Sequence, residues 1–285
     1  MKRYLLVLAA LAAAFTALAG SAGAITGNYT DDFVHDNVGL LVFYTPNTPA
    51  GEDPFSHRCS GTLISPTVMV TAGHCTTGVN DGRVYFQQSA APNYDPNAFG
   101  GFGGDPTTGY PYQGGVTFHR ADNYGFLAGF PETKDLGVVV LDTPVTPAHG
   151  FGVLPSVGAI DRYIAAAGAN GKKDARFTVS GYGLSDQDPR PVSFRKRLMA
   201  TSYAINNEAP ITEFNLKTTA NASQGKGGTC NGDSGGPVFF YGTNVIAAVT
   251  SFGQNGQCKG QDFSYRLDRA PVLSWINDPN RVDAG

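Results

Sequence analysis

The chain consists largely of short apolar segments that end in turn residues, and this pattern limits the fold more than any other feature. Val38–Tyr44 stops at a Thr-Pro pair, and Leu136–Leu141 stops at Asp-Thr-Pro. Similar segments lie at Val68–Thr71 and at residues 61–64, 177–181, 237–241 and 245–251, the last two joined by a predicted hairpin turn at 242–244. Such a series predicts an all-β sandwich or barrel.

Composition and the remaining segments agree with this fold class. Glycine supplies 37 of 285 residues and charged residues only 15%, which argues against a helical bundle. Residues 91–115 are dense in Gly, Pro, Asn and Tyr and predict a long surface loop. The Pro-rich stretch 143–155 is a candidate crossover between two halves. Only the C-terminus looks helical, with Asp268 as a candidate cap, Pro271 near the start, and an apolar face of Val272, Leu273 and Ile276.

Residues 1–24 predict a signal peptide. A Lys-Arg pair follows the initial Met, residues 4–18 are apolar, and the tripeptide 22–24 (Ala-Gly-Ala) offers small residues for cleavage, with 17–19 (Ala-Leu-Ala) as the alternative. The apolar stretch is shorter than the roughly 20 residues that span a bilayer. We therefore expect a secreted, extracellular protein with no membrane association after cleavage.

The charge balance argues against nucleic acid as a partner. The formal charge is −3, and removal of Lys2 and Arg3 with the leader would make it −5. A protein without a basic surplus has little to offer phosphates. Arg195, Lys196 and Arg197 form a local basic cluster, which we expect to be a solvated strand or loop.

Four cysteines in an exported chain suggest two disulfides. Their number alone permits three pairings. Metal binding is the rival interpretation, and it is weak because the chain has no Cys-x-x-Cys pair.

The sharpest local motif is residues 232–237, Gly-Asp-Ser-Gly-Gly-Pro. A serine between glycines can sit on a tight turn whose free backbone amides stabilise an oxyanion. The pattern also fits the nucleophile elbow of α/β-hydrolases, in which the histidine follows the serine. All five histidines, at positions 35, 57, 74, 119 and 149, precede Ser234, so the base must come from upstream.

His74 and Asp135 are the best partners for Ser234. His74 follows an apolar run directly and stands next to Cys75, which can fix the backbone when oxidised. Histidine suits a base that activates a serine hydroxyl. Asp135 opens a wholly apolar segment, where a carboxylate is costly unless it is paired, so we expect it to orient the imidazole.

These residues resemble the chymotrypsin/trypsin family of serine proteases. The order His, Asp, Ser is that of the family's triad. Residues 71–75 (Thr-Ala-Gly-His-Cys) are similar to the family's Thr-Ala-Ala-His-Cys, residues 135–139 (Asp-Leu-Gly-Val-Val) to Asp-Ile-Ala-Leu-Leu, and the block 232–237 matches fully. The resemblance covers nearly the whole chain after the leader.

The resemblance implies a fold of two packed six-stranded antiparallel β-barrels with a C-terminal α-helix. It implies a protease domain over residues 25–285, with barrels at about 25–145 and 156–285 and the active site between them. It also implies that disulfides join Cys59 to Cys75 and Cys230 to Cys258.

The implied activity is that of a serine endopeptidase. Ser234 attacks the peptide bond, His74 transfers the proton, Asp135 holds the imidazolium, and water releases the acyl-enzyme. The Gly232 and Ser234 amides would form the oxyanion hole. No cofactor or metal is expected, the substrates are proteins or peptides, and the enzyme is expected to be a monomer.

The resemblance also predicts an activating ion pair. In this family a free N-terminal Ile or Val pairs with the aspartate before the nucleophile, here Asp233. Ile25 directly follows the cleavage pattern at 22–24. We therefore expect signal peptidase itself to create the active N-terminus, with cleavage after Ala19 and later trimming as the alternative.

Specificity is less defined by the sequence. Gly228 stands at the floor of the primary pocket, where trypsin-like members carry Asp. Ser251, Phe252 and Gly253 match the family's Ser-Trp-Gly wall, which should pair with extended substrate. Asp262 falls near a second pocket position, so an acidic pocket and a neutral pocket for large apolar residues both remain open.

Two other functions are rivals. One is a catalytically silent homologue that acts as a binding protein, although such homologues usually lose a triad residue and none is missing here. The other is an esterase on the same fold. The glycosylation sequons that begin at Asn28 and Asn221 are interpreted as coincidence.

Overall fold

The structure is a computed structural model that describes residues 25–44, 55–79, 81–90, 115–126, 129, 131–167, 175–185, 195–205 and 211–281. The predicted signal peptide and residues 91–114 of the predicted surface loop lie outside these ranges. Within the described ranges, no helix has the length and apolar character needed to cross a membrane.

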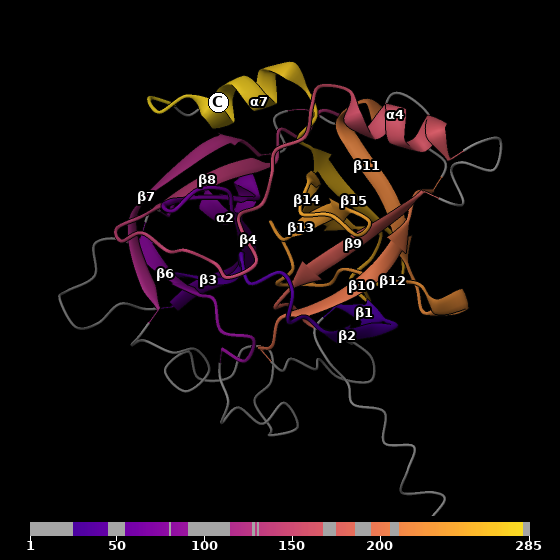
Figure 1. The fold of residues 1–285 in the computed structure, drawn as a ribbon, viewed down its shortest axis with the longest axis horizontal. Helices are drawn as coiled ribbons and strands as arrows, with labels where there is room; N and C mark the ends of the chain where they lie inside the picture. Colours follow the sequence, from indigo (N-terminus) through magenta and orange to yellow (C-terminus); the bar gives the residue numbers. More distant parts are fainter. Residues whose placement is uncertain are drawn as a thin grey trace, which may run out of the picture.

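The first half of the described chain forms a closed antiparallel barrel of six strands, in the order β3-β4-β5-β8-β7-β6 (Figure 1). Its interior is a cluster of fully buried side chains that includes Phe43, Leu63, Met69 and Phe118. The strands are β3 (Val38–Tyr44), β4 (Phe55–Leu63), β5 (Val68–Thr71), β6 (Asp81–Tyr85), β7 (Val116–Gly125) and β8 (Leu136–Leu141).

The second half is an antiparallel sheet in the order β11-β15-β14-β13-β9-β10-β2. A bridge between Ala204 and Thr218 joins the end of β10 to β11, and a second core forms from residues of β9, β10, β11, β13 and β14. Short β2 (Tyr29–Asp31) adds to the free side of β10. The other strands are β9 (Arg176–Gly181), β10 (Leu198–Tyr203), β11 (Asn215–Ala220), β13 (Pro237–Phe240), β14 (Ile246–Gly253) and β15 (Gly260–Arg266). The predicted all-β fold of the chymotrypsin type is confirmed.

Both ends of the described chain cross to the opposite half. The N-terminal strand β1 (Thr26–Gly27) pairs with β12 (Gly227–Gly228), and the C-terminal helix α7 (Ala270–Asn277) lies over the first barrel (Figure 1). Val272 and Ile276 of α7 belong to a cluster that contains buried residues of both halves, such as Val38 and Tyr265. These crossings hold the two halves together around a shared core.

The helices differ from the sequence prediction in two respects. Beside α7, the structure contains α4 (Ala159–Ala166) and the one-turn helices α2 (Gly73–Thr76) and α6 (Ile211–Phe214), so the expectation that only the C-terminus is helical is wrong. Asp268 does not cap α7, whose N-cap is Arg269. Instead Asp268 is fully buried and accepts hydrogen bonds from Arg266 and from the Ile160 amide at the start of α4.

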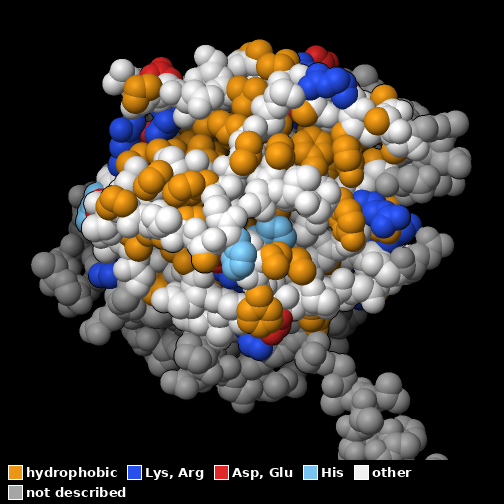
Figure 2. All heavy atoms as spheres, viewed as in Figure 1, with side chains coloured by type: hydrophobic (Ala, Val, Ile, Leu, Met, Phe, Trp, Pro, Cys, Tyr) orange, Lys and Arg blue, Asp and Glu red, His pale blue; other side chains and the backbone are white. Residues whose placement is uncertain are grey.

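The location of the basic cluster at 195–197 also differs from the sequence prediction. Arg195 and Arg197 are buried and Lys196 is partly exposed, so the prediction of a solvated segment is wrong. Arg197 donates hydrogen bonds to the backbone carbonyls of Asp32, Val38 and Phe86 and thereby bridges the two halves. On the face drawn in Figure 2, the coloured Lys and Arg side chains lie in small separate groups and form no broad basic patch.

Candidate active site

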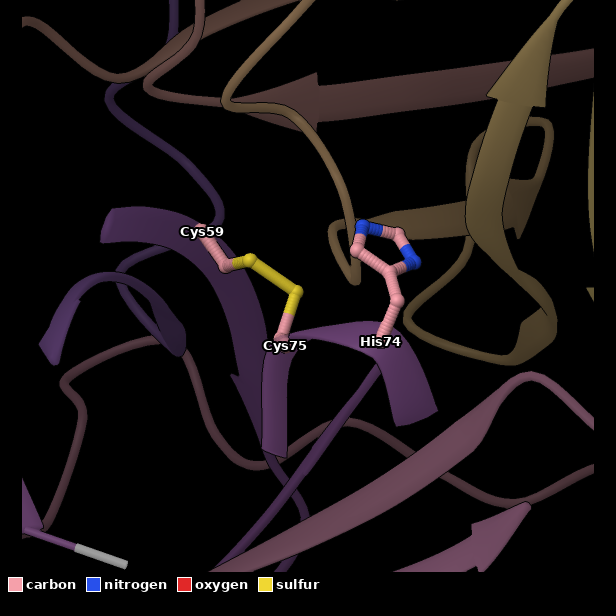
Figure 3. A group of neighbouring side chains, drawn as sticks. All are labelled: Cys59, His74 and Cys75. Atoms are coloured by element: carbon pink, nitrogen blue, oxygen red, sulfur yellow. A yellow bond between two sulfur atoms is a disulfide. The ribbon is translucent and has the colours of Figure 1, made fainter. Parts of the chain in front are cut away.

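His74 lies on α2, the single helical turn that follows β5. The Cys59–Cys75 disulfide ties this turn to β4, as the sequence resemblance implied. Figure 3 shows the imidazole projecting from α2, away from the disulfide and toward the second half of the chain. The His74 side chain is 25% exposed, so the ring is both fixed and accessible.

Asp135 holds this imidazole. Its Oδ2 lies 2.9 Å from His74 Nδ1, and its Oδ1 accepts a 2.8 Å hydrogen bond from the His74 backbone amide. The Ser251 hydroxyl donates a short hydrogen bond to Oδ2. Asp135 is fully buried at the entry to β8, and these donors compensate for the loss of water.

Ser234 lies half-buried in a tight turn with two glycines in the left-handed region. Gly232 has φ +97° and Gly235 has φ +75°, which side-chain-bearing residues rarely adopt. Within the described chain, neither the Gly232 nor the Ser234 amide donates a hydrogen bond, while the Gly235 amide binds the Thr250 carbonyl at 2.7 Å. Two free amides beside a serine are the donors that an oxyanion requires.

The serine turn packs against the segment that leads to His74. A side chain at Gly235 would overlap the Thr71 hydroxyl and the Ala72 amide nitrogen. Ser60, on β4, donates its amide to the Ser234 carbonyl at 2.8 Å and its hydroxyl to the Gly232 carbonyl at 3.0 Å. Within the described part of the chain, the hydrogen bonds of His74 run to Asp135, and none joins its ring to Ser234 Oγ.

Asp233 is fully buried beneath the same turn. Its carboxylate accepts the amides of Gly183 at 2.8 Å and Cys230 at 2.9 Å, and also bonds the backbone amide of Ile25. Burial raises the pKa of Asp233 to about 7, against the opposing effects of these amides and of the Arg58 cation. The predicted partner Ile25 is thus next to Asp233 and is itself fully buried.

Asp262 lies between the two glycines predicted to line the specificity pocket. A side chain at Gly228 would meet Asp262 Oδ2 at 2.7 Å, and one at Gly253 would meet Oδ1 at 3.7 Å. Oδ2 accepts the Thr229 amide at 2.6 Å, whereas Oδ1 is buried with no hydrogen-bond partner. Burial raises the pKa of Asp262 to about 7.

Aromatic rings flank the site on both halves. Phe252, predicted to line the substrate wall, stacks on Phe263 with ring centroids 4.7 Å apart. Phe126 lies 5.4 Å from the His74 ring and is 42% exposed. Sequence reasoning missed Phe126 and Ser60, because neither belongs to a motif and only the fold brings them to the site.

The metal interpretation of the cysteines finds no support in their bonding. Cys59, His74 and Cys75 lie close enough together to resemble a ligand cluster, as Figure 3 shows. Both sulfurs, however, are bonded to each other. Cys230 and Cys258 form the second disulfide. A disulfide sulfur is not the thiolate that a metal requires.

The other four histidines have separate partners. His57 bonds the Cys75 carbonyl at 2.8 Å, and His35 pairs with the buried Asp32 at 2.9 Å. The exposed His119 and His149 lie near aspartates, His119 near Asp81 and Asp142, and His149 near the half-buried Asp36. Among the described histidines, only His74 contacts Asp135.

Comparison with known sequences places this geometry in a family. The family model described as Trypsin matches residues 43–276. Trypsin zeta of Drosophila melanogaster is 24% identical over 245 residues, which is 82% of this chain and 78% of that protein. Brachyurin of Leptuca pugilator is 28% identical over 210 residues, 70% of this chain and 78% of that protein.

Solved structures share the fold at low sequence identity. HL collagenase superposes with a TM-score of 0.62 at 19% identity, covering 88% of this chain and 96% of the other. Human heparin binding protein gives a TM-score of 0.57 at 18% identity, with 90% and 98% covered. The match of the family model over most of the chain shows that this protein belongs to the trypsin family of serine proteases.

Proposed function

We propose that this protein is a secreted serine endopeptidase in which Ser234, His74 and Asp135 form the catalytic triad. The observation that carries the proposal is the 2.9 Å contact between His74 Nδ1 and the buried Asp135 carboxylate. This contact keeps the proton on Nδ1 and leaves Nε2 as the basic nitrogen.

In the proposed mechanism, His74 Nε2 removes the proton from Ser234 Oγ as the hydroxyl attacks the scissile carbonyl. Catalytic hydrogen bonds are often long in the free enzyme and tighten in the substrate complex, so the absent Ser234–His74 bond is compatible with this step. The free amides of Gly232 and Ser234 receive the oxyanion. His74 then protonates the leaving amine, and water hydrolyses the acyl-enzyme by the same route.

We also propose that residues 1–24 are a signal peptide and that their removal creates the active N-terminus at Ile25. The Ile25 nitrogen, already bonded to Asp233, would then carry a positive charge beside a buried carboxylate. The next residues support this arrangement, because Thr26 pairs with Gly228 and the Asn28 side chain donates to the Ala222 carbonyl at 2.6 Å. Sequencing the N-terminus of the active secreted protein tests this, and a start at Gly20 contradicts it.

For specificity, we propose that the pocket is acidic and prefers Arg or Lys. The support is the unpartnered, buried Oδ1 of Asp262 between Gly228 and Gly253. Because the pKa of Asp262 is about 7, the preference should strengthen from pH 6 to pH 8.5. Chromogenic peptides ending in Arg, Phe and Leu test this at both pH values. Equal cleavage after Arg and Phe at pH 8.5 would favour the neutral pocket.

The experiment that tests the main proposal compares the wild type with Ser234→Ala. We expect the wild type to cleave a peptide library and to react stoichiometrically with an organophosphonate, and the variant to do neither. A wild type that does not react would favour the rival function of a silent binding protein, a possibility raised by human heparin binding protein on the same fold. Turnover of esters without peptides would favour an esterase.

A further inference from the structure

The peptide unit that joins Gly73 to His74 is held on its carbonyl side by an unusual number of donors. The Gly73 oxygen accepts the Thr77 amide at 3.0 Å and the hydroxyls of Thr76 at 3.2 Å and Thr77 at 2.9 Å. The Asn123 side chain donates the shortest of these bonds, at 2.7 Å. A carbonyl oxygen has two lone pairs, so four donors around one oxygen form a crowded, shared arrangement.

Asn123 differs from the other donors in its origin. Thr76 and Thr77 belong to α2 or follow it directly, whereas Asn123 lies on β7. Its amide nitrogen also contacts the hydroxyls of Thr76 at 3.0 Å and Thr77 at 2.9 Å. Asn123 therefore fixes the whole end of α2 to the barrel wall.

The opposite side of the same peptide unit faces the acid of the triad. The His74 amide donates to Asp135 Oδ1 at 2.8 Å, and the His74 ring lies against Oδ2. Hydrogen bonds to a carbonyl polarise its peptide and strengthen the bond that its N–H donates. A donor on Gly73 O thus acts on the Asp135 carboxylate through a single peptide group.

We propose that Asn123 is a positioning residue of the active site, which orients the Gly73–His74 peptide so that Asp135 and the imidazole meet in the productive geometry. This rests on the proposed function, since it assigns a role within the same triad. The hydrogen bonds of Asn123 described above end on Gly73, Thr76 and Thr77, so its proposed role is to position the Gly73–His74 peptide and not to react.

The test is a double-mutant cycle that combines Asn123→Ala with Asp135→Asn, with rates normalised to folded protein by circular dichroism and thermal melts. We expect N123A alone to lower kcat about tenfold with KM changed less than twofold. We expect no further loss when N123A is added to D135N, because the Asp135 carboxylate, on which Asn123 is proposed to act through the Gly73–His74 peptide, has already been replaced. Asn123→Asp, which keeps the shape but cannot donate, should resemble N123A and covers the case in which N123A folds poorly.

Asn37→Ala provides the matched control, because Asn37 also donates its side-chain amide to a glycine carbonyl, that of Gly150, at 3.0 Å, and Gly150 belongs to none of the site's motifs. It should leave kcat unchanged per folded molecule. The positioning role would be overturned if N123A and N123D kept the wild-type kcat. It would also be overturned if N123A lowered kcat by the same factor in the wild type and in D135N. The proposed function itself fails on a different result, namely peptide hydrolysis by Ser234→Ala.

Discussion

Substitution of Gly73 by alanine is the sharpest perturbation that the active site offers. The family's usual motif has alanine at this position, but here a methyl group at Gly73 would overlap the Gly125 carbonyl oxygen and lie 3.0 Å from the Leu136 amide nitrogen. Both neighbours are backbone atoms, so no side chain can turn aside. Ordinary contacts between carbon and oxygen begin near 3.3 Å, so α2 must move by roughly 1 Å relative to β7 and β8.

The magnitude follows from that displacement. Overpacking in a tight core costs about 1–3 kcal/mol, offset in part by about 1 kcal/mol of helix propensity gained over glycine. The net loss of about 0–2 kcal/mol corresponds to a fall in Tm of up to about 8 °C for a chain of this size. Because α2 carries His74, a 1 Å displacement of the base should lower kcat/KM by about 10²-fold.

Calorimetry measures the fall in Tm of G73A, and steady-state cleavage of a peptide substrate measures its fall in kcat/KM. Gly129→Ala is the matched control, since nothing lies within 4 Å of its added methyl group and its φ is not positive. We expect G129A to behave like the wild type in both assays. Wild-type Tm and kcat/KM in G73A would show that the close approach of α2 to Gly125 does not constrain the base, and would refute this reasoning.

Three further outcomes are expected. Asp135→Asn should lower kcat by about 10⁴ at pH 8 in steady-state assays, because it favours the wrong imidazole tautomer; a loss below tenfold would contradict the triad. The pKa of Asp262 rises from 3.8 to about 7 on folding, so its stabilising contribution is present below about pH 4 and is lost as the pH rises toward 7. Thermal melts of Asp262→Asn and the wild type at pH 4 and pH 8 test this. The variant should compare more favourably with the wild type at pH 8 than at pH 4. The same difference in Tm at both pH values would refute the pKa shift. Replacing Cys59 and Cys75 by alanine opens a loop with a sequence separation of 16 and should cost about 3 kcal/mol in chemical denaturation, which an unchanged midpoint would contradict.

Local patterns in the sequence predicted most strands and the pairing of Asp135 with His74. Val38–Tyr44, Val68–Thr71 and Leu136–Leu141 are strands with the bounds expected from their apolar runs. Asp135 was recognisable because a carboxylate at the entry of such a run needs a partner, and the structure contains that contact with His74. These inferences succeed because each depends on residues adjacent in the chain.

The errors came from residues whose neighbours are distant in sequence. Asp268 has the position of a helix cap, yet it is buried and accepts the Ile160 amide, from a residue 108 positions away. Arg197 has the character of a surface cation, yet three backbone carbonyls from the first half of the chain hold it inside. A local pattern does not reveal partners that arrive only after the halves have packed.

The sequence by itself determined the all-β class and was enough to propose Ser234, His74 and Asp135 as the triad, because chain order and turn chemistry can be read from the sequence alone. Only the tertiary structure decided which groups surround them: Ser251 on Asp135, Asn123 on the Gly73 carbonyl, and Asp262 beside the Gly228 backbone. Those contacts join residues from different strands. Their geometry depends on how the sheets close and pack, which no short segment of the chain encodes.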